Sequence, residues 1–488
     1  MRVLLIDPPV RLSARPDMPP LGLMYIASFI RQYGHEVEII SINAYRYTED
    51  EVIRRIKKTD FDVIGIGGMC TVYSYVKWLC QEIKQIYPKV PIVVGGSVSS
   101  PMPEFLLSHT EADIAVIGEG EHTMQELLTC FETDEDIGSV PGICYKKGKE
   151  ILRAGNRQRI SDLDNLPFPA WDLVPMDIYI ANATLTSLES RWIPQDVQSN
   201  LSPLRAVTII STRGCPERCT FCYRSMGHGI RLRSITNVIN EIKTLMDNYG
   251  ANIFDFLDEN FTVSRSRALE FCDYMEAEKL SIAYRITGSR VDGVDEELLL
   301  RLKETGCYGI MYGIESGSQK MLDVMKKRTT VADNKRAIEI ARKVGLRCNA
   351  PWIIGMPGET PETVEESRRF YKEVWHAHLG VYYATPYPGT EIWETAKQMG
   401  RIGDEEQFII SLGDITEYTV NLTDAFTDKE LRAAARRVVK DVNRAAAGGW
   451  LQVLVKDMLS RIRGVFHYYR IYGLQKTVRR ILQEVNRS

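Results

Sequence analysis

The chain has 488 residues, of which 44% are hydrophobic and 26% charged, the composition of a globular protein with more than one domain. A formal net charge of −3 gives no basis for nucleic-acid binding. We expect no secretory signal and no membrane span, because no apolar run approaches the ~20 residues that a span requires. Most of the ten cysteines stand singly among apolar residues, so we expect reduced thiols and a cytoplasmic protein.

Residues 1–135 alternate short β-branched runs with segments of helical spacing. This alternation predicts an α/β fold, a doubly wound, Rossmann-like parallel sheet with helices on both faces. The expected strands are 2–6, 36–40, 62–66, 92–94 and 113–117, and the expected helices are 21–33, 49–58, 72–87 and 102–107.

Unusual sequences, most of them glycine-rich, follow the expected strands at their carboxyl ends, where such sheets bind ligands. They are Asp7-Pro8-Pro9, Gly67-Gly68-Met69-Cys70-Thr71, Gly95-Gly96-Ser97 and Gly118-Glu119-Gly120-Glu121. Glycine lets a large ligand approach the backbone closely. The alternative is a flavodoxin-like domain whose glycines only form tight turns. A dinucleotide site is a weaker reading, because G-x-G-x-x-G does not follow the first strand.

Residues 136–205 are expected to connect two domains. The runs 140–145 and 150–153 flank Lys146-Lys147-Gly148-Lys149 and predict a hairpin. Residues 163–171 contain two prolines and should cross the surface in extended form. Residues 178–203 show little periodicity, so we expect an irregular linker that can lie over the active site.

Three cysteines, Cys215, Cys219 and Cys222, follow an expected strand at 206–211 with C-x3-C-x2-C spacing. Three thiolates without a fourth cysteine or histidine nearby suit a cubane iron–sulfur cluster with one open iron. A structural zinc site normally has four protein ligands. Because His228 lies six residues further on, a Cys3His zinc site remains open as an alternative.

Residues 206–400 resume the alternation of strands and helices. Six βα units predict a partial (β/α)6 barrel, with ligand groups at the carboxyl ends of the strands. The expected strands are 206–211, 252–257, 282–286, 309–313, 347–354 and 380–384, and the expected helices include 235–248 and 264–278.

Polar or glycine-rich sequences also follow the barrel strands. They are Asp258-Glu259-Asn260-Phe261, Gly288-Ser289-Arg290, Gly313-Ile314-Glu315-Ser316-Gly317-Ser318, Gly355-Met356-Pro357-Gly358-Glu359-Thr360 and Pro386-Tyr387-Pro388-Gly389-Thr390-Glu391. Several of these residues also have structural interpretations. Glu315 can cap the helix after it, and Arg290 can pair with Asp292 or Glu315. Thr360 before Pro361 is a good helix start, and Cys307 and Cys348 are assigned to packing.

Residues 401–488 are expected to form a helical C-terminal region, with helices at 429–446 and 451–485. From Lys440 onward there are ten Lys and Arg against three Asp and Glu. A basic amphipathic tail of this kind can make peripheral contact with an anionic membrane. The alternative is a helix pair packed against the barrel with a solvated basic face.

The cysteine spacing, with an aromatic residue directly before the third cysteine, closely resembles the radical S-adenosylmethionine (SAM) superfamily. The resemblance implies that Cys215, Cys219 and Cys222 hold a [4Fe-4S] cluster whose open iron binds SAM. It also implies an external electron donor, flavodoxin or ferredoxin. The SAM-binding residues that it implies are Phe221 at the adenine, Arg290 at the methionine carboxylate, Glu315 and Ser316 at the ribose or methionine end, Asp258, Glu259 and Asn260 towards the substrate, and Pro357.

Residues 1–135, taken together with the cysteines, resemble the cobalamin-binding domain of cobalamin-dependent radical SAM enzymes. The similarity covers Asp7-Pro8-Pro9, Pro20-Leu21-Gly22-Leu23, Gly34-His35-Glu36-Val37, Val94-Gly95-Gly96-Ser97 and Gly118-Glu119-Gly120-Glu121, in that order. No D-x-H-x-x-G motif occurs, so we expect base-off cobalamin with no histidine on cobalt and residues 69–75 facing its lower side. The implied cobalamin-binding residues are Leu21, Gly67, Gly68, Met69, Cys70, Thr71, Tyr73, Gly95, Gly96, Ser97, Val98, Gly118, Glu119 and Gly120.

The two resemblances together imply a cobalamin-dependent radical SAM methyltransferase. Such an enzyme would methylate an unactivated carbon by means of a 5′-deoxyadenosyl radical and methylcobalamin. Its substrate would be a small molecule, a lipid or a tetrapyrrole-like compound. One alternative is a cyclase or ring-rearranging enzyme that uses both cofactors without net methyl transfer, like the anaerobic magnesium-protoporphyrin ester cyclase. The other is a non-catalytic cobalamin sensor with a structural cluster.

Overall fold

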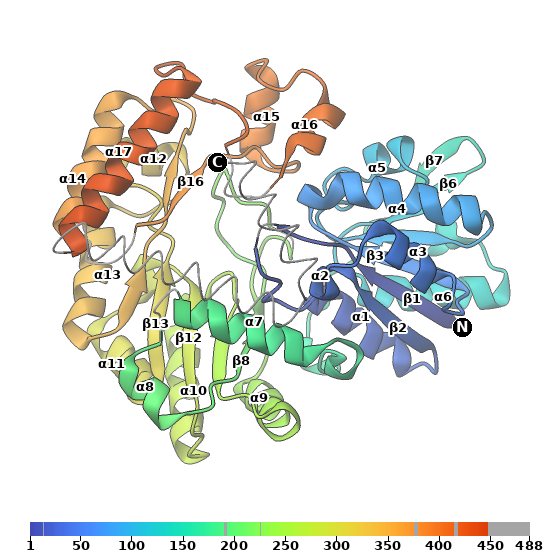
Figure 1. Cartoon of the computed structure of the whole chain (residues 1–488), viewed down its shortest axis with the longest axis horizontal. Helices are drawn as coiled ribbons and strands as arrows, with labels where there is room; N and C mark the ends of the chain where they lie inside the picture. The colour runs from blue at the N-terminus through green and yellow to red at the C-terminus, as the bar shows by residue number, and fades with distance from the viewer. Residues whose placement is uncertain (13, 190–192, 225, 375–378, 414–417, 448–488) are drawn as a thin grey trace.

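The computed structural model describes residues 1–488 except 13, 190–192, 225, 375–378, 414–417 and 448–488. Two α/β units lie side by side, the N-terminal sheet in one and the barrel strands in the other (Figure 1). Helices α15 (Glu391–Gln398) and α16 (Glu405–Ser411) lie over the junction between the units.

The N-terminal unit is a seven-stranded sheet in the order β2-β1-β3-β4-β5-β6-β7. Strands β1 to β5 pair in parallel, which confirms the predicted doubly wound sheet. The predicted hairpin is also present, and it extends this sheet because β6 pairs antiparallel with β5. The strands are β1 (Arg2–Asp7), β2 (Glu36–Ser41), β3 (Val63–Gly67), β4 (Ile92–Gly95), β5 (Ile114–Val116), β6 (Ile143–Lys147) and β7 (Glu150–Arg153).

Helices cover both faces of this sheet, so its central strands are apolar on both sides. In β1, Val3 and Leu5 belong to one buried cluster, while Leu4 and Ile6 belong to another. The helices and 3-10 turns up to the barrel are α1 (Leu21–Arg31), α2 (Ile42–Tyr45), α3 (Glu49–Ile56), η1 (Cys70–Val72), α4 (Tyr73–Ile86), α5 (Pro103–His109), α6 (Glu121–Thr133), η2 (Ile137–Ser139), η3 (Leu163–Asn165) and η4 (Trp171–Leu173).

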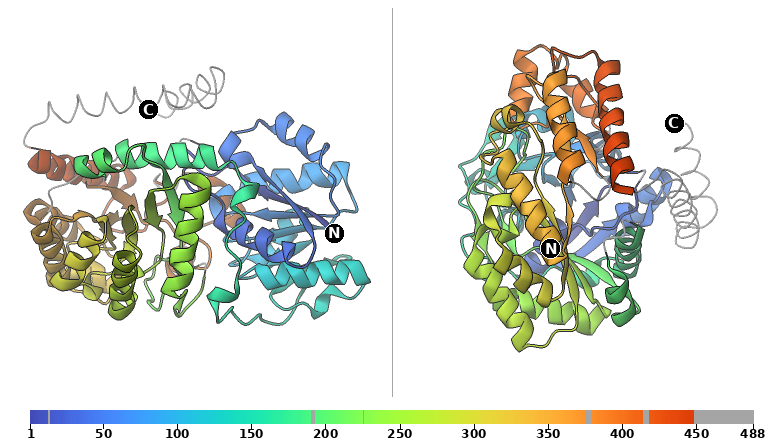
Figure 2. Two further views of the ribbon diagram at one scale, coloured as in Figure 1. Left: turned by 90° about the horizontal axis from the view of Figure 1, so that it is seen from below. Right: turned by 90° about the vertical axis from the view of Figure 1, so that its left-hand side faces the viewer.

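The expectation of an irregular linker at 178–203 is wrong. This segment contains most of α7 (Met176–Glu189) and all of α8 (Gln195–Asn200). Helix α7 packs beside the first barrel strand and reaches from the barrel to the N-terminal unit (Figure 2). The Asn182 side chain donates to the carbonyl oxygen of Pro16 at 3.1 Å. The segment therefore joins the two units as a buried helix.

The barrel contains six positions for parallel strands, as predicted, but the fifth is divided. Five strands pair in the order β14-β13-β12-β11-β8, while β15 pairs with β16 in a second sheet. Between β14 and β15, Pro351 has no N–H to donate to a ladder. Its carbonyl oxygen instead accepts from the N–H of Glu315 at 3.1 Å, and the N–H of Ile353 donates to the oxygen of Glu315 at 2.9 Å. Glu315 thus links the two sheets.

The elements of this unit alternate as expected for βα repeats. The strands are β8 (Ala206–Ile209), β9 (Thr212–Arg213), β10 (Arg231–Leu232), β11 (Ile253–Phe256), β12 (Ala283–Ser289), β13 (Cys307–Tyr312), β14 (Arg347–Asn349), β15 (Trp352–Ile354) and β16 (Val381–Tyr383). The helices are α9 (Ile235–Tyr249), α10 (Arg265–Ala277), α11 (Glu296–Glu304), α12 (Gln319–Val324), α13 (Val331–Val344) and α14 (Pro361–Val374), with 3-10 turns η5 (Phe261–Val263) and η6 (Val291–Gly293).

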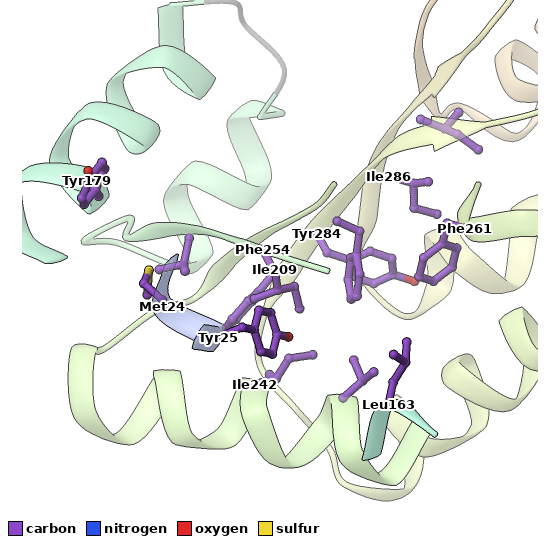
Figure 3. Packing of buried hydrophobic residues seen from close by; sticks show 14 of the residues in the cluster. Met24, Tyr25, Leu163, Tyr179, Ile209, Ile242, Phe254, Phe261, Tyr284 and Ile286 are labelled. Carbon is purple, nitrogen blue, oxygen red and sulfur yellow. The ribbon is translucent and has the colours of Figure 1, made fainter. Parts of the chain in front are cut away.

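Aromatic side chains fill the layer between barrel strands and helices. The rings of Phe256 and Phe261 have centroids 5.0 Å apart, and Tyr284 lies 5.8 Å from Phe256. Tyr25 of α1 and Leu163 belong to the same buried cluster (Figure 3). The apolar core therefore continues from one unit into the other, which makes independent motion of the two units costly.

The described part of the C-terminal region contains the helices α16 and α17 (Asp428–Ala447), and the described residues between them are not helical. Helix α17 confirms the predicted helix at 429–446 and packs against α14. The expected helix at 451–485 lies outside the described residues. Among the residues that the structure covers, no helix is both long enough and apolar enough to cross a membrane.

Candidate active site

The cysteine loop, residues 214–224, begins directly after β9. Strands β9 and β10 pair antiparallel and close its base. Gly214 has a φ of +87°, and a Cβ at this position would lie 2.2 Å from the oxygen of Gly229. The backbone of Thr220 donates to the oxygen of Met325 at 3.0 Å and accepts from the N–H of Ile392 at 3.1 Å. The loop is thus fixed at its base and against α12 and α15.

The three thiols differ in exposure: Cys219 is buried, Cys215 is half-buried and Cys222 is exposed. The Cys219 and Cys222 thiols are in hydrogen-bond contact, and Cys215 lies within electrostatic range of Cys219. In the described part of the chain, no three His, Cys, Asp or Glu side chains are already arranged as a metal site, and this includes the three thiols. The backbone of His228 forms an isolated β-bridge with that of Cys215.

This donor set fits a cluster better than zinc. Three soft thiols leave one position of a metal centre open, as a cluster with one open iron requires. The hydrogen bond from Cys222 lowers the pKa of Cys219, and the cations of Lys327 and Arg290 lower it further. These groups favour the thiolate of Cys219, which is the form that binds iron, whereas burial raises the pKa of Cys215 and the hydrogen bond with Cys219 raises the pKa of Cys222.

A buried ion pair lies beside Cys219. The Nζ of Lys327 lies 3.1 Å from Oε1 of Glu315, and both side chains are buried. Burial lowers the pKa of Lys327, but Glu315 and the nearby cysteines outweigh this and raise it, so the ammonium is retained. A Cβ on Gly313 would lie 2.5 Å from that Nζ, so this glycine makes room for the pair. The suggestion that Glu315 caps the next helix is wrong, because α12 begins at Gln319 with Ser318 as its N-cap residue.

Arg290 also lies beside the cysteine loop. Its Nε and Nη2 donate to the two oxygens of Asp292 at 3.0 and 2.8 Å, which is one of the two ion pairs considered as alternatives. Its Nη1 donates to the oxygen of Lys327 at 3.1 Å and lies 3.7 Å from Oε2 of Glu217. The guanidinium is therefore held near Cys219 by partners on three segments, and contact with the methionine carboxylate stays a prediction.

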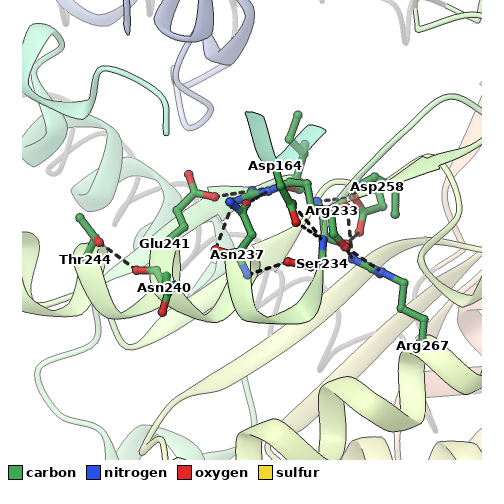
Figure 4. A network of polar contacts seen from close by, with 12 residues as sticks. Asp164, Arg233, Ser234, Asn237, Asn240, Glu241, Thr244, Asp258 and Arg267 are labelled. Carbon is green, nitrogen blue, oxygen red and sulfur yellow. Dashed lines mark hydrogen bonds and ion pairs between the residues drawn. The ribbon is translucent and has the colours of Figure 1, made fainter. Parts of the chain in front are cut away.

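Asp258, predicted to face the space between SAM and substrate, is used by the protein itself. Its carboxylate accepts from the N–H and the hydroxyl of Ser211, both at 2.7 Å, and from the N–H of Thr212 at 2.8 Å. Arg267 donates to the oxygen of Ser211, also at this strand end, at 3.1 Å (Figure 4). Burial raises the pKa of Asp258, and its role here is to join the ends of β8 and β11.

The remaining residues of the predicted SAM set are arranged around the cysteine loop and the strand ends. Ser316 is fully buried and its hydroxyl lies 3.1 Å from that of Ser367, so it supports the turn after β13. Glu259 is exposed and within electrostatic range of Cys215. Asn260 is buried, whereas Phe221 and Pro357 are half-buried.

The loops after β3 and β4 form one surface at the carboxyl edge of the N-terminal sheet. The N–H of Val98 donates to the oxygen of Gly68 at 3.1 Å, and the N–H of Cys70 donates to the hydroxyl of Ser97 at 3.2 Å. A Cβ on Gly96 would lie 2.5 Å from the oxygen of Gly68, whereas one on Gly118 would meet open space. A backbone edge without side chains fits a broad ligand such as cobalamin.

Other members of the predicted cobalamin set vary in their exposure. Tyr73 is fully buried, and its hydroxyl donates to Glu406 of α16 at 2.7 Å. Cys70 and Val98 are also buried. Further positions of this set are half-buried: Leu21, Gly67, Met69, Thr71, Gly95, Ser97 and Gly120. His35, His109 and His122 lie on or beside helices of this unit, and the expectation of no histidine on cobalt stays a prediction.

Sequence reasoning missed an ion-pair network between the two units. Glu119 accepts from Nη1 of Arg213 at 2.8 Å and from Nη1 of Arg231 at 2.6 Å, while Glu121 accepts from Nη2 of Arg213 at 2.7 Å. We call these four residues the interdomain network. The carboxylate of Glu119 thus faces the base of the cysteine loop. Nothing in the local sequence around these residues marks them as partners, because 92 to 112 residues separate each glutamate from its arginine.

Tyr223, next to the third cysteine, was also missed. Its ring and Pro101 both lie against Gly389, where a Cβ would be 3.1 Å from Tyr223 and 2.7 Å from Pro101. Its hydroxyl contacts Ser100, and burial raises the pKa of Tyr223 to about 12. The cysteine loop, the cobalamin-side loops and the last barrel loop therefore meet at this residue.

A second missed contact joins Asp7 and Tyr179. The hydroxyl of Tyr179 donates to Oδ2 of Asp7 at 3.1 Å, and burial raises the pKa of Asp7 to about 7. The contact fastens α7 to the end of β1.

A surface hollow of about 420 Å³ lies elsewhere, near Trp171 and Tyr249, and is lined by none of the predicted site residues.

Both sites lie within parts of the chain that match known protein families. Residues 8–128 fit the family model of the B12 binding domain, and residues 209–371 fit that of the radical SAM superfamily. The chain is 32% identical over 403 residues to an uncharacterized methyltransferase of Pyrococcus horikoshii, over 81% of this chain and 83% of that one. The chain belongs to the radical SAM enzymes that carry a B12-binding domain. The resemblance described from the sequence is thereby confirmed.

Other radical SAM proteins show how varied the relatives are. The anaerobic magnesium-protoporphyrin IX monomethyl ester cyclase of Rubrivivax gelatinosus is 27% identical, over 84% of this chain and 72% of its own. Among solved structures, the radical SAM methyltransferase TsrM from Kitasatospora setae, with cobalamin and a [4Fe-4S] cluster bound, aligns with a TM-score of 0.66 and 20% identity. It covers 82% of this chain and 78% of its own, so the two proteins share a fold.

Proposed function

We propose that this radical SAM enzyme methylates an unactivated carbon of a small organic substrate, with SAM as the methyl source and cobalamin as the methyl carrier. The observation that supports this most directly is the position of Tyr223. It follows the third cysteine, its hydroxyl contacts Ser100 of the N-terminal unit, and its ring lies with Pro101 against Gly389, which supports a location of the two sites next to each other.

The residues of the chain supply binding and orientation. Cys215, Cys219 and Cys222 would hold the [4Fe-4S] cluster, and the loops at Gly68, Gly96 and Gly118 would hold cobalamin. When bound, the cluster supplies the electron that cleaves SAM, and cobalamin supplies the transferable methyl group.

Charged groups beside the cysteines would orient SAM. Arg290 is near Cys219, and Asp292 holds its Nε and Nη2, so the remaining N–H groups of the guanidinium would bind the methionine carboxylate. Glu315 is held by Lys327 next to the same thiol and would contact the ribose or the methionine end.

The stoichiometry of SAM products tests the proposal. Each methylated product requires two SAM molecules, one giving S-adenosylhomocysteine and the other giving methionine and 5′-deoxyadenosine. Anaerobic turnover with reduced flavodoxin or ferredoxin as electron donor should therefore yield S-adenosylhomocysteine and 5′-deoxyadenosine in a 1:1 ratio.

A cyclase is the second candidate, because one relative over most of the chain is a cyclase. That reaction would give 5′-deoxyadenosine without S-adenosylhomocysteine. Deoxyadenosine alone, with a substrate that gains no methyl group, would therefore contradict methylation and support cyclisation. A cobalamin sensor would form neither product.

A further inference from the structure

Two arginines face each other across the base of the cysteine loop. Arg213 on β9 and Arg231 on β10 are paired in register, in a ladder of only two residue pairs. Their side chains are only 4% and 13% exposed. Like charges directly opposite each other destabilise a strand pair, and burial strengthens the repulsion. The base of the loop therefore cannot rely on its own residues for stability.

The opposing charges come from the N-terminal unit. Glu119 lies between the two arginines and accepts from both, at 2.8 and 2.6 Å, while Glu121 accepts the second amino group of Arg213 at 2.7 Å. Both carboxylates are 5% exposed. Glu119 also accepts from the N–H of Ile160 at 3.0 Å, which fixes its own position. The interdomain network therefore has two positive and two negative charges, shared across the boundary between the units.

Arg231 extends this constraint to the segment after the cysteines. Its Nη2 donates to the oxygen of Met226 at 3.0 Å, and its Nη1 donates to the oxygen of Ile160 at 2.8 Å. The guanidinium of Arg213 also lies 4.9 Å from the ring centroid of Tyr25 in α1. Each arginine is thus held by groups outside the barrel.

We propose that Glu119, assisted by Glu121, is a positioning residue that shapes the cysteine loop for its cluster. The B12-binding unit then has a second role: it neutralises the paired arginines so that β9 and β10 can close. This inference rests on the proposed function only in assigning a cluster to the loop, and its principal readout does not depend on catalysis.

Hydrogen–deuterium exchange of the full chain, prepared anaerobically without iron, tests the proposal. In Glu119→Gln, peptides from residues 212–224 should exchange at least tenfold faster than in the wild type, while peptides from β1 and β3 should be unchanged. After reconstitution, iron bound per chain should fall in the same variant. The matched control is Glu104→Gln, whose carboxylate pairs with Arg153 at 3.0 Å on the same unit and is half exposed.

A double variant distinguishes positioning from general damage. Glu119→Gln with Arg231→Gln leaves one arginine and one glutamate, so exchange of residues 212–224 should return towards the wild-type rate. The proposal would be overturned if residues 212–224 exchanged at the same rate in Glu119→Gln as in Glu104→Gln. It would also be overturned if these residues exchanged as fast in the double variant as in Glu119→Gln. If Glu119→Gln does not fold, recovery of folded protein in the double variant supports the proposal and failure to recover overturns it. Absence of methylated product would contradict only the proposed function.

Discussion

The ammonium of Lys327 and the carboxylate of Glu315 form a buried ion pair at 3.1 Å, next to Cys219 of the cysteine loop. Glu315 has a φ of +60°, and its backbone also joins the two sheets of the barrel. A left-handed backbone is unfavourable for a glutamate unless its surroundings hold it. The pair therefore fixes a strained residue at the point where the barrel sheets meet and the thiols lie.

Replacement of Lys327 by Met should be strongly destabilising, because it leaves the carboxylate of Glu315 buried without its partner. We expect a loss of about 3–5 kcal/mol in the free energy of unfolding. Adding Glu315→Gln should recover part of this loss. Denaturant unfolding of the iron-free chain measures both values, with exposed Lys326→Met as the control. A loss no larger than that of the control would mean that the pair does not hold the turn.

Replacement of Cys219 by Ala should abolish 5′-deoxyadenosine formation while cobalamin binding is retained, because the thiol and the cobalamin loops lie on different units. Chromatography of SAM products and the visible spectrum of bound cobalamin measure the two effects. Cys130→Ala, a buried cysteine on α6, is the control and should form the product at the wild-type rate. Deoxyadenosine from the Cys219 variant would refute the cluster assignment.

Asp7 should make the protein less stable as the pH rises from about 4 to 7. Burial raises the pKa of Asp7 to about 7 in the folded chain, against ~3.9 when unfolded. In this range Asp7 stays protonated in the folded state but is ionised in the unfolded state. The free energy of unfolding therefore falls by up to about 1.4 kcal/mol per pH unit. Asp7→Asn should therefore gain stability relative to the wild type between pH 5 and pH 7 in urea unfolding. If the difference in stability between Asp7→Asn and the wild type were the same at pH 5 and pH 7, this prediction would be contradicted.

Tyr73→Phe should lower stability by about 1 kcal/mol, since it removes one hydrogen bond to Glu406. Cobalamin affinity should stay within twofold of the wild type, because the ring is fully buried and its hydroxyl points to α16. Equilibrium titration with hydroxocobalamin measures the affinity. A tenfold loss would show instead that Tyr73 contacts the cofactor, as the resemblance had suggested.

The sequence predicted most of the strands, because runs such as β3 and β4 are short, rich in β-branched residues and bounded by turn residues. It did not predict the two-residue strands β9 and β10. It could not predict α7, because apolar residues such as Ile178, Ala181 and Leu185 also occupy the side of that helix opposite the buried Tyr179. A helix buried between two units has no polar stripe, so no helical period is visible. The division of the fifth barrel strand depended on Pro351, whose position inside an apolar run was the available signal.

Motif spacing located the cysteines but not the charges around them. Lys327 stands in a run of basic residues, Lys326-Lys327-Arg328, that resembles an exposed surface. Lys326 and Arg328 are indeed exposed, yet Lys327 between them is buried. Glu119 was predicted from a glycine-rich motif to meet cobalamin, but its carboxylate faces two arginines. Partners of buried charges are set by the packing of distant segments, which spacing along the chain does not encode.

The order of the interdomain network along the chain bears on biosynthesis. Glu119 and Glu121 precede Arg213 by 94 and 92 residues, so both glutamates leave the ribosome long before the arginine. Because domains commonly fold as units from the N-terminus during synthesis, the sheet that carries the glutamates can be complete when β9 emerges. The cysteine segment would then be guided into shape by a template already present, and its thiols would be grouped early for iron delivery.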